Sequence, residues 1–313
     1  MKNHLLTVAD LTVEDIEGIF ELTDKLKEEV KNGVDHPILA GKALGMIFQK
    51  SSTRTRVSFE TGMFQLGGHA LFLSSNDIQL GRGESISDTA KTLSRYIDGI
   101  MIRTYDHSDV EELAEEGTVP VINGLTDLLH PCQILADLYT IQEKKGNLEG
   151  KKLAYLGDGN NIANSLLLGT TKVGMDVAIA TPDDYKPNSE IIAKAKKQAE
   201  KSGSKVEIID DPEAAVKDAD AVYTDTWASM GDEDEKEARM KDFDGYQVTT
   251  ELMSTAKDDA IFLHCLPAYR GQEMTDEVID GPQSVVFDEA ENRMHVQKAI
   301  MAKLMADNEG KDL

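Results

Sequence analysis

Short apolar segments alternate with longer stretches of helical periodicity along the whole chain. The apolar segments predict strands at residues 43–49, 69–73, 99–104, 119–123, 152–157, 176–180, 205–209, 221–224, 260–264 and 284–287. Helical patterns separate most of them: Phe59, Met63 and Leu66 share one face, and Ala, Lys and Glu dominate residues 191–201. This alternation is typical of an α/β fold, in which helices cover both faces of parallel sheets.

The pattern also predicts two domains. A helical stretch at residues 131–145 stops at Gly146, and a new apolar strand follows it. A chain of 313 residues is long enough for two doubly wound domains, which we predict at residues 1–147 and 148–313. The last helix, at about residues 289–306, has apolar residues at four-residue spacing and therefore one packing face.

Charge and cysteine content exclude several classes of protein. The chain has 57 acidic and 33 basic residues and a formal charge of -24, which argues against binding to nucleic acid or to an anionic membrane. Its two cysteines, Cys132 and Cys265, cannot build a disulfide framework or a zinc site by themselves. The chain has neither an apolar segment of spanning length nor a start typical of a signal peptide, so we expect a cytoplasmic protein.

The first candidate motif is Ser51-Ser-Thr-Arg-Thr-Arg56, which follows a predicted strand and opens a helix. Hydroxyls and backbone N–H groups at a helix N-terminus form an anion site, and Arg54 can grip two phosphate oxygens. Arg56 points about 200° away around the helix, so we expect it to form a structural ion pair. The alternative is a Ser/Thr cap with surface arginines. The motif lacks the glycines and the lysine of a Walker A loop.

Three further polar residues lie near predicted strand ends in the first half of the chain. His130 precedes Pro131, which suits a first helical position, and Gln133 lies one turn further along. This pair can polarise a carbonyl group and hold an amide, although a capping His with a surface Gln is the alternative. Arg103 ends an apolar strand, where parallel α/β sheets bind ligands, unless it forms a surface salt bridge.

The second half has its own candidates at strand ends. Gly157-Asp-Gly-Asn-Asn161 superficially resembles a dinucleotide loop, but Ile162 replaces the third glycine, so Asn161 fits a carboxylate-binding role better. Asp225 could pair with a substrate ammonium group and Ser229 could hydrogen-bond it, or Asp225 could begin an Asx turn. We expect Cys265 to be structural or to line the substrate site.

Arg293, near the start of the last helix, is either a second anion contact or a surface charge. The acidic stretch at residues 232–237 is more simply a solvated loop than a metal site.

Taken together and in this order, the motifs resemble those of the ornithine carbamoyltransferases, in the aspartate/ornithine carbamoyltransferase family. The motifs are Ser-Thr-Arg-Thr-Arg at 52–56, His-Pro-Cys-Gln at 130–133, Gly-Asp-Gly-Asn-Asn at 157–161, Asp-x-x-x-Ser-Met-Gly at 225–231 and His-Cys-Leu-Pro at 264–267. Aspartate carbamoyltransferases share the first motif and His-Pro-x-Gln but differ later, and putrescine carbamoyltransferases typically lack the Ser-Met-Gly loop.

The resemblance implies transfer of a carbamoyl group from carbamoyl phosphate to the δ-amine of L-ornithine, a reaction of arginine metabolism that gives L-citrulline and phosphate. It implies two α/β domains, a last helix that crosses back to the first domain, and a homotrimer with active sites between subunits. It implies no metal and no organic cofactor.

The resemblance also implies a role for each candidate residue. The carbamoyl phosphate group would be Ser52, Thr53, Arg54, Thr55, Gln79, Arg103, His130, Gln133 and Arg293, with Gln79 reaching the neighbouring subunit's site. The ornithine group would be Asn161, Asp225, Ser229, Met230, Cys265 and Leu266. The catalytic members would be Arg103, His130, Cys265 and Arg293.

Three other functions remain open from the sequence. Another amine such as putrescine could replace ornithine, although the loop from Ser229 to Gly231 argues against it. A nicotinamide dehydrogenase would need the missing glycine fingerprint. A relative that binds without catalysis would be expected to lack catalytic residues, and here all of them are present.

Overall fold

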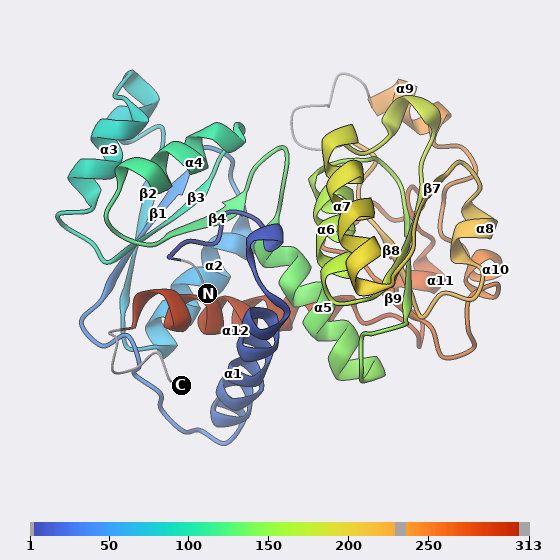
Figure 1. Cartoon of the computed structure of the whole chain (residues 1–313), viewed down its shortest axis with the longest axis horizontal. Helices are drawn as coiled ribbons and strands as arrows, with labels where there is room; N and C mark the ends of the chain where they lie inside the picture. The colour runs from blue at the N-terminus through green and yellow to red at the C-terminus, as the bar shows by residue number, and fades with distance from the viewer. Residues whose placement is uncertain (1–2, 229–235, 307–313) are drawn as a thin grey trace. The chain divides into compact units, whose positions relative to one another are not determined.

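The computed structural model describes residues 3–228 and 236–306, which fold into two compact units (Figure 1). Unit 1 combines Met1–Ala136 with Glu291–Leu313, and unit 2 is Asp137–Ala290. Two helices run across the division: α5 (Pro131–Lys145) and α12 (Val286–Met305). The last helix therefore returns to the first unit.

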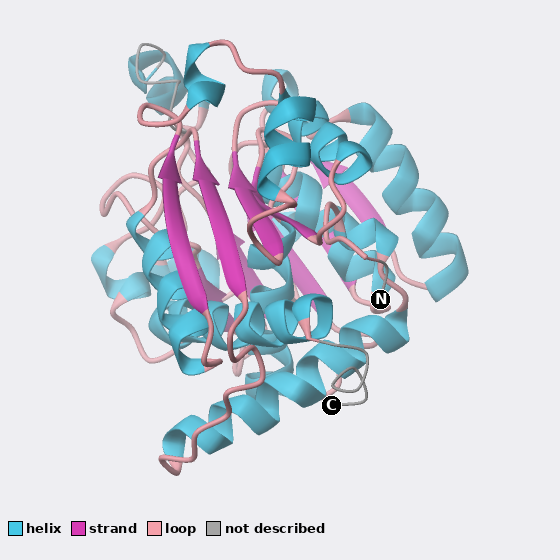
Figure 2. Cartoon of the chain, turned by 90° about the vertical axis from the view of Figure 1, so that its left-hand side faces the viewer, coloured by secondary structure: helices cyan, strands magenta, loops and turns pink. Residues whose placement is uncertain are grey.

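Unit 1 is built on a parallel sheet with strand order β2-β1-β3-β4, flanked by helices (Figure 2). Its strands are β1 (Ala43–Phe48), β2 (His69–Ser74), β3 (Gly99–Arg103) and β4 (Val121–Leu125). Its helices are α1 (Val13–Lys31), α2 (Thr53–Gln65), α3 (Ile86–Leu93) and α4 (His107–Glu116), with short 3-10 turns η1 (Val8–Asp10) and η2 (Gln79–Arg82). The strands β3 and β4 are buried along their whole length because both faces of the sheet are covered.

Unit 2 is built on a second parallel sheet, with strand order β7-β6-β5-β8-β9. Its strands are β5 (Lys152–Leu156), β6 (Asp176–Ala180), β7 (Val206–Ile209), β8 (Ala221–Thr224) and β9 (Ile261–Leu263). Its helices are α6 (Asn161–Lys172), α7 (Ser189–Ser202), α8 (Pro212–Val216), α9 (Lys236–Asp242), α10 (Thr250–Met253) and α11 (Asp276–Ile279), with the 3-10 turn η3 (Asp183–Tyr185).

Short polar side chains fix where the functional helices begin. Ser52 accepts a hydrogen bond from the Thr55 backbone N–H at the start of α2, and Asn160 accepts from Ile162 and Ala163 at the start of α6. These caps satisfy amide groups that the first helical turn leaves without partners. Both helices follow central strands, β1 and β5, so both begin at the carboxyl edge of their sheet.

The predicted fold class is confirmed, and one predicted strand is wrong. Residues 284–287 do not form a strand: Ser284 makes a single bridge to Phe262, and α12 begins at Val286. A short apolar run fits either a strand or the buried start of a helix, and here Glu289 N–H donates to the Val285 carbonyl in a helical turn. Among the described helices, none is both long and apolar enough to cross a bilayer.

Candidate functional site

The first motif forms a polar helix start in unit 1. Ser52 and Thr53 lie at the beginning of α2, directly after β1. The Ser52 hydroxyl donates to Thr55 Oγ1 at 3.1 Å and accepts from the Thr55 backbone N–H at 3.2 Å. Thr55 is buried, whereas Thr53 is exposed. Because the helix dipole and the first N–H groups favour negative charge, this arrangement can hold a phosphate.

Two arginines of unit 1 lie close to His130. Arg103 ends β3 beside Phe48 of β1, and Arg293 lies in α12. All three side chains are buried, with at most 6% of each exposed. The Arg293 Nη2 atom donates to Thr55 Oγ1 at 3.1 Å, which links the last helix to the first motif. Arg293 is therefore an internal cation and not a surface charge.

The electrostatics of this cluster keep His130 neutral. Burial lowers the pKa of His130 well below its usual value, and the positive charges of Arg293 and Arg103 lower it further. An uncharged imidazole beside two guanidinium groups can donate or accept a hydrogen bond without adding charge. Gln133 is fully buried one turn into α5, and its N–H donates to the His130 carbonyl. The cluster is suited to an anion next to a polar carbonyl group.

The neighbouring arginines of α2 have different surroundings. Arg56 forms an exposed ion pair with Glu60 at 3.0 Å and stacks over the Phe72 ring at 3.8 Å, which confirms its structural role. Arg54 is partly buried at the first turn, beside the helix N-terminus. Gln79 lies exposed in η2, beyond the end of the edge strand β2.

Asp225 is the centre of a second polar cluster, in unit 2. It follows β8, and Cys265 follows the neighbouring strand β9. Asp225 Oδ2 accepts from Asn160 Nδ2 at 2.9 Å, and its Oδ1 accepts from the Cys265 thiol at 3.2 Å. Sequence reasoning singled out Asn161 and missed Asn160. The signal for Asn160 was its position as the helix cap, which aims its amide at the neighbouring strand end.

Cys265 is a protonated thiol in this setting. Burial raises its pKa well above the usual value, and the carboxylates of Asp225 and Glu289 raise it further. Burial also raises the pKa of Cys132 to about 12, and its thiol lies 3.4 Å from the Asn123 carbonyl oxygen. A thiolate nucleophile is therefore disfavoured at both positions. Cys265 can act as a neutral hydrogen-bond donor.

The glycines of the Gly-Asp-Gly loop serve chain packing. Gly157 has a φ of 142°, and a Cβ on Gly159 would lie 2.2 Å from the Pro187 backbone nitrogen. Only glycine fits such a close approach. Asn161, partly buried, opens α6 behind this loop. Ser229 and Met230 lie outside the described residues.

One set of possible metal ligands occurs among the described residues. Atoms of Asp225, His264 and Cys265 lie within 4.8 Å of one another. However, His264 Nδ1 accepts from the Leu266 N–H, its Nε2 faces Glu273 at 3.1 Å, and the thiol holds its proton. Because no imidazole nitrogen is open, this cluster is not prepared for a metal ion.

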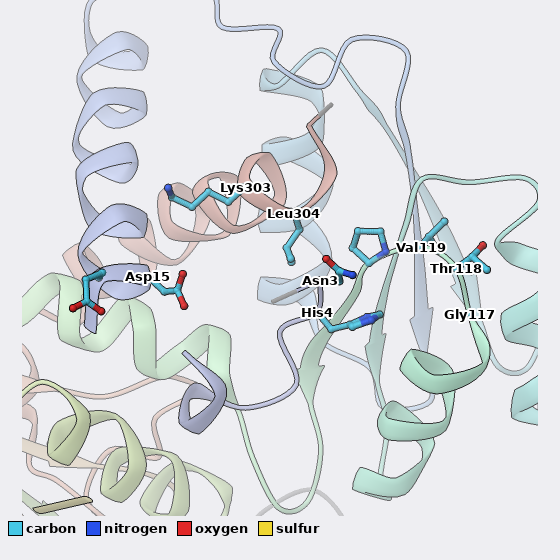
Figure 3. Close-up of a pocket in the computed structure, with 10 residues that line it drawn as sticks. Asn3, His4, Asp15, Gly117, Thr118, Val119, Lys303 and Leu304 are labelled. Atoms are coloured by element: carbon cyan, nitrogen blue, oxygen red, sulfur yellow. The ribbon is translucent and has the colours of Figure 1, made fainter. Parts of the chain in front are cut away.

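A separate cavity lies at the opposite edge of the unit 1 sheet. It measures about 460 Å³ and lies before the start of β4, whereas the motif residues follow the carboxyl ends of strands (Figure 3). Its lining contains none of the motif residues and consists of Asn3, His4, Glu14, Asp15, Gly117, Thr118, Val119, Pro120, Lys303 and Leu304.

Comparisons with known proteins cover both units. Residues 3–143 match the carbamoyl-P binding domain of aspartate/ornithine carbamoyltransferases, and residues 149–304 match the Asp/Orn binding domain. An ornithine carbamoyltransferase of Caldicellulosiruptor saccharolyticus is 62% identical over 298 residues, which is 95% of this chain and 97% of that protein. An anabolic ornithine carbamoyltransferase of Pyrococcus furiosus is 56% identical, with 96% of each chain covered.

Solved structures agree with this assignment. The ornithine carbamoyltransferase of Pyrococcus furiosus matches with a TM-score of 0.94 over 96% of each chain, at 56% identity. The anabolic enzyme of Campylobacter jejuni matches with a TM-score of 0.91 at 45% identity, over 96% of this chain and 98% of that one. With both domain types in the family's order and identities this high, the chain belongs to the aspartate/ornithine carbamoyltransferase family.

Proposed function

We propose that this chain transfers the carbamoyl group of carbamoyl phosphate to the δ-amine of L-ornithine, giving L-citrulline and phosphate. The observation that carries the proposal is the buried cluster of Thr55, Arg103, His130 and Arg293 beside the start of α2. It places two cations and a neutral imidazole together in a chain whose formal charge is -24. The names of the relatives at 56–62% identity support the same reaction.

In unit 1, the phosphate would bind at the α2 N-terminus. Its ligands would be Ser52, Thr53, Arg54 and Thr55 together with Arg103 and Arg293, while Gln133 would hold the carbamoyl amide. Arg293 Nε is buried and has no hydrogen-bond partner among the described residues, so it is a donor that a ligand oxygen can take. Leaving such a donor without a partner is costly unless a ligand satisfies it.

In unit 2, the amino-acid end of ornithine would bind around Asp225. The carboxylate would pair with the α-ammonium group, and Asn161, Ser229 and Met230 would hold the remaining polar atoms. Cys265 and Leu266 would line the path of the side chain. We assign residues 1–147 to carbamoyl phosphate and 148–313 to ornithine, with the last helix returning to the first domain.

The chemistry needs positioned charge and no redox partner. The neutral δ-amine attacks the carbamoyl carbon, a C–N bond forms, the C–O bond to phosphate breaks, and the amine proton leaves with the phosphate. Negative charge grows on the carbamoyl oxygen and on the phosphate as this happens. Arg103, His130 and Thr55 would stabilise the charge on the carbamoyl oxygen. One such donor commonly lowers the barrier by about 3 kcal/mol.

Product formation from carbamoyl phosphate with ornithine, putrescine and aspartate, each tested alone, decides the proposal. Citrulline from ornithine alone is the expected result. A preference for putrescine would keep the transfer chemistry and overturn the amino-acid site. Folded protein that is silent with all three amines would contradict the enzyme assignment and leave a binding function.

We further propose a homotrimer in the cytoplasm. Three apolar side chains are exposed on α2 and on the α2-facing side of the edge strand β2: Val57, Phe64 and Phe72. Exposed apolar side chains on two neighbouring elements are typical of a surface covered by a partner. A second copy seated there would lie close to the end of β2, where Gln79 is exposed and could reach the partner's site. The unpaired cysteines fit a reducing compartment.

A further inference from the structure

His264 connects three segments of unit 2 through hydrogen bonds. It follows β9, directly before Cys265, and is fully buried. Its backbone N–H donates to Glu289 Oε2 at 2.9 Å. Its ring contacts Leu266 on one side and Glu273 on the other. Backbone and side chain are therefore both fixed by hydrogen bonds.

The hydrogen bonds determine which ring nitrogen carries the proton. The Leu266 backbone N–H lies 2.9 Å from His264 Nδ1 and can only donate, so Nδ1 must be the acceptor. In a neutral ring the proton then sits on Nε2, which donates to Glu273 Oε1 at 3.1 Å. Glu273 is itself buried, and the same oxygen accepts the Tyr269 N–H at 2.7 Å. The Leu266 N–H and Glu273 together thus fix the orientation and the tautomer of the ring.

The ring of His264 accepts a hydrogen bond from a residue with an unusual backbone conformation, Leu266. Leu266 has a φ of 58°, in the left-handed region that a branched side chain rarely adopts. Such a conformation persists where its surroundings hold it, and it is a feature found at functional sites. Here the imidazole accepts the N–H of the strained residue itself. Cys265 lies between His264 and Leu266, and its thiol donates a hydrogen bond to Asp225.

We propose that His264 is a positioning residue for ornithine. Its neutral imidazole holds Leu266 in the left-handed conformation, and this turn directs Cys265 toward Asp225 and presents Leu266 to the substrate side chain. The inference rests on the proposed ornithine site. His264 itself touches no substrate, so its loss should weaken ornithine binding and leave carbamoyl phosphate binding, which belongs to unit 1, unchanged.

Two substitutions separate this role from simple packing. His264→Asn places an amide oxygen near the position of Nδ1 and can still accept the Leu266 N–H. His264→Gln is closer to histidine in volume, but its amide lies near the position of Nε2 and leaves that N–H without its acceptor. If His264 only fills space, the Gln variant should bind ornithine better than the Asn variant. If His264 positions Leu266, the Asn variant should bind ornithine better.

Steady-state kinetics with both substrates provide the measurement. We expect His264→Gln to raise the KM for ornithine by about tenfold or more and His264→Asn by about threefold or less, with the KM for carbamoyl phosphate within about twofold in both. The reverse order of the two variants, or equal increases for both substrates, would overturn the proposal. If the unsubstituted chain makes no citrulline, the proposed function fails instead.

A second background covers the case in which a variant folds poorly. Glycine adopts positive φ freely, so in Leu266→Gly the backbone no longer needs the imidazole. The effect of His264→Gln on the KM for ornithine should therefore be at least about threefold smaller in the Leu266→Gly chain than in the original chain. Effects of equal size in both chains would show that His264 does not act through Leu266.

Discussion

At the scale of single residues, burial distinguishes side chains of the same type. Arg293 is 4% exposed and donates to Thr55, whereas Arg270 is an exposed arginine paired with Asp276 and Asp280. Both are arginines near acidic or polar partners, so their sequence context does not distinguish them clearly. Their surroundings give them different expected roles.

Arg293→Ala should cripple the reaction. The substitution removes a buried cation that faces the proposed phosphate, so kcat/KM for carbamoyl phosphate should fall by about a hundredfold or more. Arg270→Ala, the matched control, should change it less than about twofold because exposed ion pairs contribute little. Initial rates at varied carbamoyl phosphate concentration give both values. Similar kinetics in the two variants would remove Arg293 from the anion site.

Asp225→Asn tests the amino-acid end of the site. The amide keeps the size of the side chain but loses the charge that would pair with the α-ammonium group, so the KM for ornithine should rise by about tenfold or more. Asp210→Asn, at an exposed position after β7, is the control and should leave this KM unchanged. An ornithine KM that stays the same in Asp225→Asn would contradict the assignment.

Both thiols should be slow to react in the folded protein. The raised pKa values of Cys132 and Cys265 keep them protonated at pH 8, and only a thiolate attacks a disulfide reagent. With 5,5′-dithiobis(2-nitrobenzoate) we expect slow colour release from folded protein and rapid release of two equivalents in guanidinium chloride. Fast modification of one thiol at pH 8 would contradict this expectation, because one of the two cysteines would then be an accessible thiolate.

At the scale of elements, α12 is fixed to α2 at two points. Arg293 donates to Thr55 in the first turn of α2, and Lys298 donates to Gln65 at its end, at 2.8 Å. Lys298 is fully buried, and burial lowers its pKa to about 8, although the charge of Glu29 opposes the shift. The second contact therefore depends on a lysine that folding makes harder to protonate.

The Lys298 contact predicts a pH-dependent stability. Because the pKa of Lys298 is lower in the folded chain than in the unfolded chain, the unfolded chain binds more protons between about pH 8 and 10.5, and stability rises with pH in that window. Relative to Lys298→Met, the free energy of unfolding should increase by about 1 kcal/mol per pH unit there. Denaturant melts of both chains from pH 7 to 10 measure it; parallel curves would contradict it.

The sequence was sufficient for elements whose pattern is long or whose position is marked by a cap. The helix at residues 131–145 and the strands from Ala43 to Thr224 were found within about two residues, because Pro131, Gly146 and the apolar runs mark their ends. The run Val285-Val286-Phe287 was misassigned as a strand because the residues that complete its helical turns, such as Glu289, lie after the apolar run. Asn160 and Glu273 were missed, and His264 was named only as part of a motif, because their roles depend on side-chain contacts between distant segments.

At the scale of the whole molecule, charge and apolar surface act in opposite directions. A formal charge of -24 repels copies of the chain, whereas Phe64 is 80% exposed on α2. An interface formed against that repulsion needs apolar area near its centre. The proposed trimer therefore depends on the apolar side chains exposed on α2 and β2, Val57, Phe64 and Phe72.

Phe64→Glu should shift the chain from trimer to monomer. The new carboxylate would be buried without a partner at the proposed interface, which costs more than the contact can return. Light scattering coupled to size exclusion should give three times the 34.4 kDa chain mass for the original protein and a single chain mass for the variant. Val34→Glu, at a half-exposed site outside α2 and β2, is the control. A monomeric original protein would contradict the trimer.

Unit 1 is built from two separate stretches of the chain, and this has a consequence for folding during synthesis. Its sheet is translated first, but the part of α12 that belongs to unit 1, with Arg293, leaves the ribosome only after all of unit 2. Domains that are continuous in sequence can fold as they emerge. Unit 2 can therefore fold while unit 1 still lacks Arg293, and a nascent chain stopped anywhere before that helix has an incomplete anion site. The unit that is begun first is the one that is finished last.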